Sequence, residues 1–280
     1  MKVIQASQIA DAVRDLSIKA NCSLQDDVVC ALGHARETEP WPVAQATLDS
    51  ILQNLEIGME KEVPLCQDTG AACVFVELGQ DVRIEGGLLA DAINEGVRRG
   101  YTEGYLRKSM VADPLRRVNT DTNVPALIHT DVVAGDSLKI TLAPKGAGSE
   151  NMSKIKMLKP ADGRAGVIDF VLQAVREAGP NPCPPIVVGV GVGGNFDHCA
   201  KLAKKALTRP TGQPNPDPFY AEMEAELLEA INRFGTGPAG FGGATTALAV
   251  HVEQMATHIA CLPVAVNINC HVARHESVVL

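Results

Sequence analysis

The stretch Pro64-Leu65-Cys66-Gln67-Asp68-Thr69-Gly70 places a thiol, an amide, a carboxylate and a hydroxyl side by side and ends on a glycine. The apolar run 71–76 follows at once, and its Val and Phe residues are typical of a buried strand. Proline before the polar residues and glycine after them indicate a loop. We therefore expect a strand over residues 73–78 that begins where this loop delivers its side chains. A purely structural loop has the same composition, so the rest of the chain must decide between the two.

Apolar residues recur at helical spacing through the first third of the chain. Later helical patterns cover residues 86–101, 167–178, 197–207 and 219–234, and strand-like runs cover 186–192, 246–252 and 259–268. The runs 126–130 and 137–143 flank Gly135-Asp136, which predicts an antiparallel hairpin. We find no repeat, low-complexity tract or long linker. The prediction is one compact α+β domain over residues 1–280, with N-terminal helices followed by a mixed, largely antiparallel sheet and flanking helices.

Composition limits the classes of partner. The 280 residues are 46% hydrophobic and carry a formal net charge of −8. A nucleic acid or an anionic membrane surface would favour a basic face, so neither is expected as a partner. There is no apolar run of ~18–20 residues and no signal-peptide pattern, so we expect a cytoplasmic protein without a membrane span. In that compartment the eight cysteines are expected to be thiols or ligands rather than disulfides.

A glycine-rich stretch, Gly189-Val190-Gly191-Val192-Gly193-Gly194, matches the G-x-G-x-x-G pattern of dinucleotide-binding loops. An NAD-binding oxidoreductase is therefore an alternative. Such a site also requires a second strand ending in an acidic residue about 20 positions on. The residues found there, 210–216, contain three prolines and cannot form a central strand. The glycines are better explained as positions where backbone passes close to another element.

Two further cysteines stand among polar residues at the ends of apolar runs. Cys199 follows Asn195, Asp197 and His198 in the first turn of an expected helix capped by Asp197, where the helix dipole favours a thiolate. Cys270 lies in Asn269-Cys270-His271, after an expected strand. The remaining five cysteines are expected to be replaceable: Cys22 as a loop residue, Cys30 as a core residue, and Cys73, Cys183 and Cys261.

Dispersed single cysteines do not fit a zinc finger, which favours paired C-x₂₋₄-C ligands, or the spacing of ferredoxins. They fit a cluster held between the loops of one domain. Three thiolates leave one iron of a [4Fe–4S] cluster without a protein ligand, and that iron can act as a Lewis acid towards substrate oxygen.

Six stretches together resemble a known family, the alpha subunit of class I, iron–sulfur fumarate hydratase and of the closely related L(+)-tartrate dehydratase. They are Cys-Gln-Asp-Thr-Gly (66–70), Leu-Arg-Lys-Ser-Met (106–110), Lys-Gly-Ala-Gly-Ser-Glu-Asn (145–151), Gly-Gly-Asn-Phe-Asp-His-Cys (193–199), Gly-Pro-Ala-Gly-Phe-Gly-Gly (237–243) and Asn-Cys-His (269–271). The resemblance covers most of the chain. It implies a hydro-lyase that hydrates fumarate to (S)-malate, with L(+)-tartrate dehydratase as the alternative.

The resemblance also implies roles for individual residues. The ligands of the [4Fe–4S] cluster fall on Cys66, Cys199 and Cys270. Gln67 and Asp68 would reach the substrate, with Asp68 acting in proton transfer, and Arg107 would hold a substrate carboxylate. The backbone from Gly146 to Gly148 would bind a substrate oxygen, and His258 would support the catalytic carboxylate.

The family further implies a partner. Its single-chain members carry a second, C-terminal domain with more basic residues and a catalytic threonine, whereas this sequence continues for only ten residues past Cys270. We therefore expect a separate beta subunit to supply the second half of a site for a small dicarboxylate. The expected assembly is a heterodimer or a higher heteromer.

Overall fold

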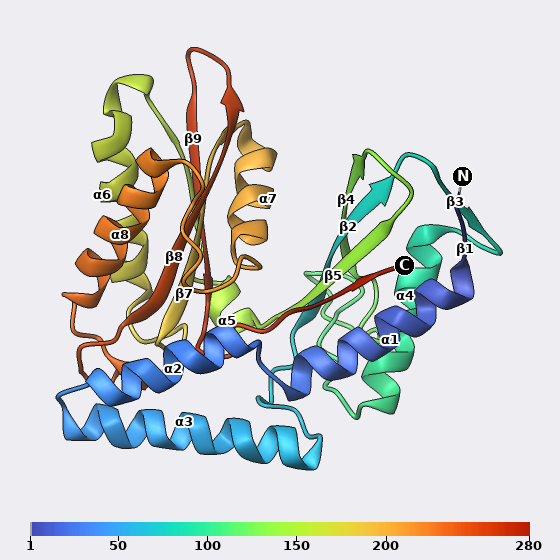
Figure 1. Ribbon diagram of the computed structural model, residues 1–280, viewed down its shortest axis with the longest axis horizontal. Coiled ribbons are helices and arrows are strands. Elements are labelled where there is room, and N and C mark those ends of the chain that lie inside the picture. The colour runs from blue at the N-terminus through green and yellow to red at the C-terminus, as the bar shows by residue number, and fades with distance from the viewer. Residues whose placement is uncertain (1) are drawn as a thin grey trace. The chain divides into compact units, whose positions relative to one another are not determined.

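A computed structural model describes residues 2–280 (Figure 1). The fold comprises two compact units, each with its own sheet and apolar core. Unit 1 is built from Met1–Gln25, Asn54–Ala147 and Arg274–Leu280, and unit 2 from Asp26–Gln53 and Gly148–Ala273. Both units are therefore discontinuous in sequence. A single domain over residues 1–280 stays a prediction.

Unit 1 has a four-stranded sheet in the order β10-β5-β2-β4 and two long helices. The core forms where the apolar faces of α1 and α4 meet the sheet, with Ile9, Val13, Ile93 and Val97 fully buried. A small parallel pair, β1 with β3, completes the unit. The elements of this unit are β1 (Lys2–Gln5), α1 (Ala6–Cys22), β2 (Ala71–Gly79), β3 (Val82–Glu85), α4 (Leu89–Glu103), β4 (Leu127–Val133), β5 (Leu138–Lys145) and β10 (Glu276–Val279).

The predicted hairpin between residues 126–130 and 137–143 is wrong. Both strands exist, as β4 and β5, but β2 lies between them, parallel to β4 and antiparallel to β5. The nine-residue β2 has five consecutive buried residues and takes the central position. The turn at Gly135 bonds to another loop instead, because its carbonyl oxygen accepts from the N–H of Asp81 at 3.0 Å.

Unit 2 contains a second mixed sheet, in the order β6-β9-β7-β8. Strand β7 is parallel to β8 and antiparallel to β9. Helix α3 runs from unit 2 into unit 1. The elements are α2 (Asp26–Thr38), α3 (Pro42–Lys61), α5 (Ala147–Glu150), β6 (Lys154–Leu158), a 3-10 turn (Pro160–Asp162), α6 (Gly163–Ala178), β7 (Ile186–Gly194), α7 (Phe196–Ala206), α8 (Pro218–Asn232), a second 3-10 turn (Pro238–Gly240), β8 (Ala247–Thr257) and β9 (Leu262–Asn269).

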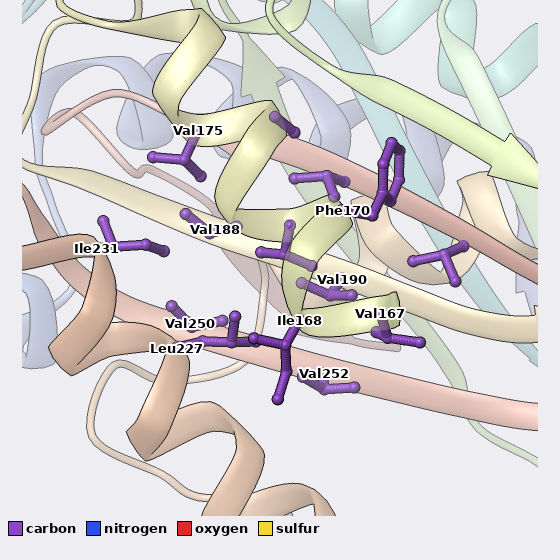
Figure 2. Packing of buried hydrophobic residues seen from close by; sticks show 14 of the residues in the cluster. Val167, Ile168, Phe170, Val175, Val188, Val190, Leu227, Ile231, Val250 and Val252 are labelled. Carbon is purple, nitrogen blue, oxygen red and sulfur yellow. The ribbon is translucent and has the colours of Figure 1, made fainter. Parts of the chain in front are cut away.

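The core of unit 2 lies between one face of this sheet and helices α6 and α8. Figure 2 shows Val188 and Val190 of β7 beside Val250 and Val252 of β8, with Leu227 of α8 reaching the same layer. These aliphatic side chains are between 0% and 4% exposed. Burying each such side chain contributes about 1.5–3 kcal/mol before chain entropy is counted. The strand ends that carry polar residues are thus attached to a rigid layer.

Helix α7 covers the other face of β7, and the glycines of β7 let it approach. A Cβ atom at Gly189 would lie 2.1 Å from the carbonyl oxygen of Ala203, and one at Gly191 would lie 2.0 Å from that of Cys199. The motif 189–194 lies within β7 itself rather than in a loop after it. The NAD-binding alternative is therefore wrong, and close backbone passage explains these glycines.

Helices and mixed sheets together confirm the predicted α+β class, and the N-terminal helices occur as expected. No helix among residues 2–280 is long and apolar enough to cross a bilayer.

Candidate active site

In unit 1, the loop 66–70 lies beside the end of β5. Strands β2 and β5 are antiparallel with Ala71 opposite Lys145, so the start of one strand adjoins the end of the other. The Asp68 carboxylate is held there by two backbone N–H groups: Gly70 donates to Oδ1 at 3.0 Å and Ala147 donates to Oδ2 at 2.8 Å. The carboxylate is half-buried and oriented by rigid backbone, as proton-transfer groups require.

Cys66 and Gln67 stand at the mouth of the same loop. The backbone N–H of Asp68 donates to the Cys66 sulfur at 3.4 Å, and the Gln67 Oε1 atom lies 3.5 Å from that sulfur. Cys66 is partly exposed and Gln67 is exposed. A thiol with a backbone donor, beside an exposed amide and an oriented carboxylate, can serve as a metal ligand next to a substrate.

Gly70 is required by the backbone at this point. Its φ is +73°, and a Cβ atom would lie 2.7–2.8 Å from backbone atoms of Lys145. Both features exclude any side chain without a shift of β5 away from β2.

Beneath the loop lie buried polar side chains that bind its carbonyl oxygens. Arg274 is 3% exposed, and its guanidinium donates to the Asp68 carbonyl oxygen. The Tyr101 hydroxyl lies 2.8 Å from the Thr69 carbonyl oxygen and 3.0 Å from that of Gly70. Burial raises the pKa of Tyr101 well above its ordinary value, so it remains a neutral donor.

Arg107 is exposed, and its main chain is tied to the loop. The Thr69 hydroxyl donates to the Arg107 carbonyl oxygen at 3.1 Å. The guanidinium is therefore borne by a segment fixed beside Asp68, where a carboxylate of a bound molecule can be gripped.

In unit 2, the structure brings Cys270 together with Cys183 rather than with Cys199. His271, the residue after Cys270, donates its backbone N–H to the Cys183 carbonyl oxygen at 3.2 Å, and its Nδ1 atom lies 3.0 Å from the same oxygen. Cys183 is exposed and has a φ of +53°, in the left-handed region that non-glycine residues rarely adopt. Such strained residues gather at functional sites.

The turn that carries Cys183 is held from two sides within unit 2. The Ala239 N–H donates to the Pro184 carbonyl oxygen at 2.8 Å, which attaches the glycine loop 237–243. A Cβ atom at Gly148 would lie 3.8 Å from the Asn181 carbonyl oxygen, so the predicted substrate-binding glycine adjoins the same turn.

Cys199 lies elsewhere in unit 2. It is 0% exposed and packs with Ala203 and Ala265, and its thiol donates to the Phe196 carbonyl oxygen at 3.4 Å. Ala265 precedes Cys270 by five residues on β9, which corresponds to roughly 16 Å along a strand. Burial raises the pKa of Cys199, which opposes the stabilisation of a thiolate that was expected from the helix dipole. The helix cap is Asn195, not the predicted Asp197.

His258 lies in the connection between β8 and β9, two strands that pair with opposite edges of β7 rather than with each other. Its Nδ1 atom accepts from the Ala260 N–H at 3.1 Å. Cys270 follows the opposite end of β9, and eight residues of strand span roughly 26 Å. Within unit 2 the structure therefore does not bring His258 to Cys270 or Cys183.

Among residues 2–280, no group of three or more His, Cys, Asp or Glu side chains is disposed to hold a metal ion. Unit 1 offers Cys66, and unit 2 offers Cys183 with Cys270. Taken unit by unit, these are exposed or partly exposed thiols close to strand ends, a donor type that iron–sulfur clusters use.

From the sequence, Cys183 was expected to be replaceable and Arg274 was not singled out. Cys183 lies in Pro180-Asn181-Pro182-Cys183-Pro184-Pro185, directly before β7, just as Cys66 follows Pro64 shortly before β2. That shared pattern was a usable signal. Arg274 gave none, since a lone arginine near a terminus is usually exposed.

Comparison with known proteins matches the sequence of this chain to one family. The fumarate hydratase (Fumerase) family model matches residues 10–279. The chain belongs to the fumarate hydratase family. A Methanocaldococcus jannaschii protein named "Putative L(+)-tartrate dehydratase subunit alpha" is 44% identical over 269 residues, covering 94% of each chain. The L(+)-tartrate dehydratase subunit alpha of Escherichia coli O157:H7 is 30% identical over 278 residues, covering 98% of this chain and 91% of that one.

These relatives confirm the family resemblance drawn from the six motifs. This fumarate hydratase family member is thus related to hydro-lyases, and the match includes the loops at Cys66, Cys183 and Cys270. The names of the relatives favour tartrate, while the name of the family favours fumarate.

Proposed function

We propose that this chain is the alpha subunit of a [4Fe–4S]-dependent hydro-lyase that reversibly hydrates fumarate to (S)-malate. The observation that carries the proposal is the Asp68 carboxylate, held by the backbone N–H groups of Gly70 and Ala147 two residues from Cys66. A family of hydro-lyases supplies the reaction class.

Cys66, Cys183 and Cys270 would hold the cluster. The hydrogen bonds between His271 and Cys183 support Cys183 over the sequence-based choice of Cys199, whose buried apolar site does not suit a ligand. When bound, a cluster with one iron lacking a protein ligand supplies Lewis acidity towards a hydroxyl and a carboxylate of the substrate.

The residues of this chain would perform the other tasks. Arg107 would grip one carboxylate with a two-pronged guanidinium, and Gln67 would orient the molecule from the loop mouth. Asp68 would take part in moving the proton at the carbon next to the one that carries the hydroxyl. Gly146 and Gly148 would present backbone to a substrate oxygen. His258 remains a proposed supporting residue, although its position between β8 and β9 gives no contact that favours the role.

A beta subunit would provide the rest. The relatives carry the name subunit alpha. Among residues 2–280, Arg107 is the one arginine that we propose as a clamp, whereas the substrate has two carboxylates. Leaving the second carboxylate unbound would cost several kcal/mol of transition-state stabilisation, on the order of a thousandfold in rate. A cytoplasmic heterodimer or higher heteromer is the assembly we propose.

L(+)-tartrate dehydration is the second candidate, favoured by the names of both relatives. The test is to reconstitute the cluster anaerobically, add the beta chain and measure turnover of fumarate and of L-tartrate. The expected result is that the alpha chain alone is nearly inactive and that the complex prefers fumarate. Preference for L-tartrate would establish the second candidate. Full activity of the alpha chain alone would contradict the two-subunit proposal.

A further inference from the structure

Asn123 is a buried amide in unit 1 that lies between the loop 66–70 and the segment that bears Arg107. It is 0% exposed and is distant in sequence from both. Its Oδ1 atom accepts from the Ser109 backbone N–H at 2.7 Å, and its Nδ2 atom donates to the Gly70 carbonyl oxygen at 3.1 Å. One side chain therefore joins the Arg107-bearing segment to the loop that carries Asp68.

A second bond joins these two segments directly, because the Thr69 hydroxyl donates to the Arg107 carbonyl oxygen. The two contacts lie on either side of Lys108, so together they fix the course of the chain at Arg107. The Gly70 end is itself rigid, because the Tyr101 hydroxyl binds the same carbonyl oxygen at 3.0 Å. Asn123 thus connects Ser109 to a fixed point.

We propose that Asn123 is a positioning residue that sets the separation between Arg107 and Asp68, and thereby selects the length of the dicarboxylate that both can engage. The inference rests on the proposed function of Arg107 and Asp68 as substrate-binding and proton-transfer groups. The two hydrogen bonds of the Asn123 side chain are both to backbone atoms, so it acts through the two segments that it joins.

The chemistry of the position supports this role. A single side chain must accept one hydrogen bond and donate another, which an amide does and a carboxylate does not. The backbone at Asn123 has a φ of +60°, a conformation that asparagine and glycine adopt more readily than other residues. Satisfied buried amides of this kind fix one arrangement of their neighbours.

Two variants separate positioning from folding. Asn123→Gly keeps the backbone conformation and removes both hydrogen bonds. Asn123→Asp keeps the acceptor for Ser109 and loses the donor to Gly70. The matched control is Asp121→Gly, an exposed residue of the same loop with a φ of +59°. All three are made in the alpha chain and measured in the cluster-loaded complex with the beta subunit.

For Asn123→Gly we expect the KM for the preferred dicarboxylate to rise about tenfold to a hundredfold, with a smaller change in kcat and unchanged iron content. The rates measured with a shorter and with a longer dicarboxylate should become more nearly equal to the rate with the preferred one. A merely structural role would lower the amount of active protein, and hence kcat, without moving KM. Asn123→Asp should raise KM as well, and Asp121→Gly should behave as wild type.

Hydrogen exchange provides a readout that needs no activity. The Ser109 amide should exchange at least about tenfold faster in Asn123→Gly and remain slow in Asn123→Asp. Unchanged exchange at Ser109 would overturn the inference, and so would faster exchange with an unaltered KM. If the wild-type complex turned over neither fumarate nor L-tartrate, the proposed function would fail, while the Ser109 exchange rate would still decide whether Asn123 joins the two segments.

Discussion

The backbone N–H of His271 donates to the carbonyl oxygen of Cys183 at 3.2 Å, and so places two cysteines that are far apart in sequence at the same end of one sheet. The contact lies within unit 2 and involves a strained Cys183. It decides which cysteines deserve to be tested first as ligands.

Replacing Cys183 with Ser should abolish stable cluster binding, whereas Cys199→Ser should retain it. The reason is accessibility: Cys183 is exposed beside Cys270, while the Cys199 thiol is buried and bonded to the Phe196 carbonyl oxygen, a bond that a serine hydroxyl can reproduce. Iron counting and visible absorption after anaerobic reconstitution provide the measurement. A full cluster in Cys183→Ser together with an empty Cys199→Ser would restore the ligand set predicted from sequence.

Arg107→Lys should lower kcat/KM by about tenfold to a hundredfold, because an ammonium does not replace a guanidinium that binds a carboxylate through two parallel bonds. The loss should appear chiefly in KM. Arg98→Lys is the control, since Arg98 is an exposed arginine of α4 paired with Glu95 at 2.6 Å. Wild-type kinetics for Arg107→Lys would remove Arg107 from the site.

Exposure to air should inactivate the loaded complex, because a cluster held by three thiolates has one iron that oxygen can release. Total iron should fall by about one atom in four. Activity should return with ferrous iron and a thiol reductant under nitrogen. A complex that kept full activity after hours in air would have a fourth protein ligand or no cluster.

The buried His251 should make the free energy of unfolding decrease at acidic pH. It is 2% exposed, its Nδ1 donates to the Ala206 carbonyl oxygen at 3.1 Å, and burial, reinforced by the nearby Arg209 charge, lowers its pKa from 6.5 to about 4. Between these values the unfolded chain binds a proton that the folded chain does not. The contribution of His251 to the free energy of unfolding is thus fully present above pH 6.5. It decreases as the pH falls towards 4, by about 3 kcal/mol in all.

Denaturant unfolding at several pH values measures this dependence. His251→Asn keeps a donor for Ala206 and removes the titrating group, so its stability should decline less steeply than that of wild type between pH 6.5 and 4. Parallel pH curves for the two proteins would show that His251 does not titrate as the structure indicates.

Local patterns predicted the elements well and their partners less well. Helices α7 and α8 and strand β2 were expected within a few residues, because each has a clear apolar period. The predicted hairpin of β4 with β5 was wrong because β2 pairs with both strands and lies between them. These pairings join residues more than fifty positions apart, and no local turn signal reveals them. Cys30, expected in the core, is exposed, and Cys22, expected in a loop, is the buried last residue of α1.

For the candidate site, too, local sequence patterns identified residues better than the contacts between them. Gln67, Asp68 and Arg107 were proposed from motifs and lie on segments that unit 1 holds together through Thr69. Cys183 had a weak signal in its flanking prolines, and its carbonyl contact with His271 appears only in the folded chain. Arg274 had no signal and is recognised by its burial, at 3% exposure. Residues that act by holding backbone leave little trace in a local pattern.

Unit 1 takes residues from both sides of unit 2 in the sequence, and this has a consequence for biosynthesis. Arg274 and strand β10 are synthesised after the rest of unit 1 and after unit 2, so the sheet edge at β5 and the support beneath the Asp68 carbonyl oxygen are added only then. A nascent chain stalled after residue 273 would contain every proposed ligand cysteine, yet the turn bearing Asp68 would lack its buried arginine. Ordering of that turn is therefore coupled to the synthesis of residues 274–280.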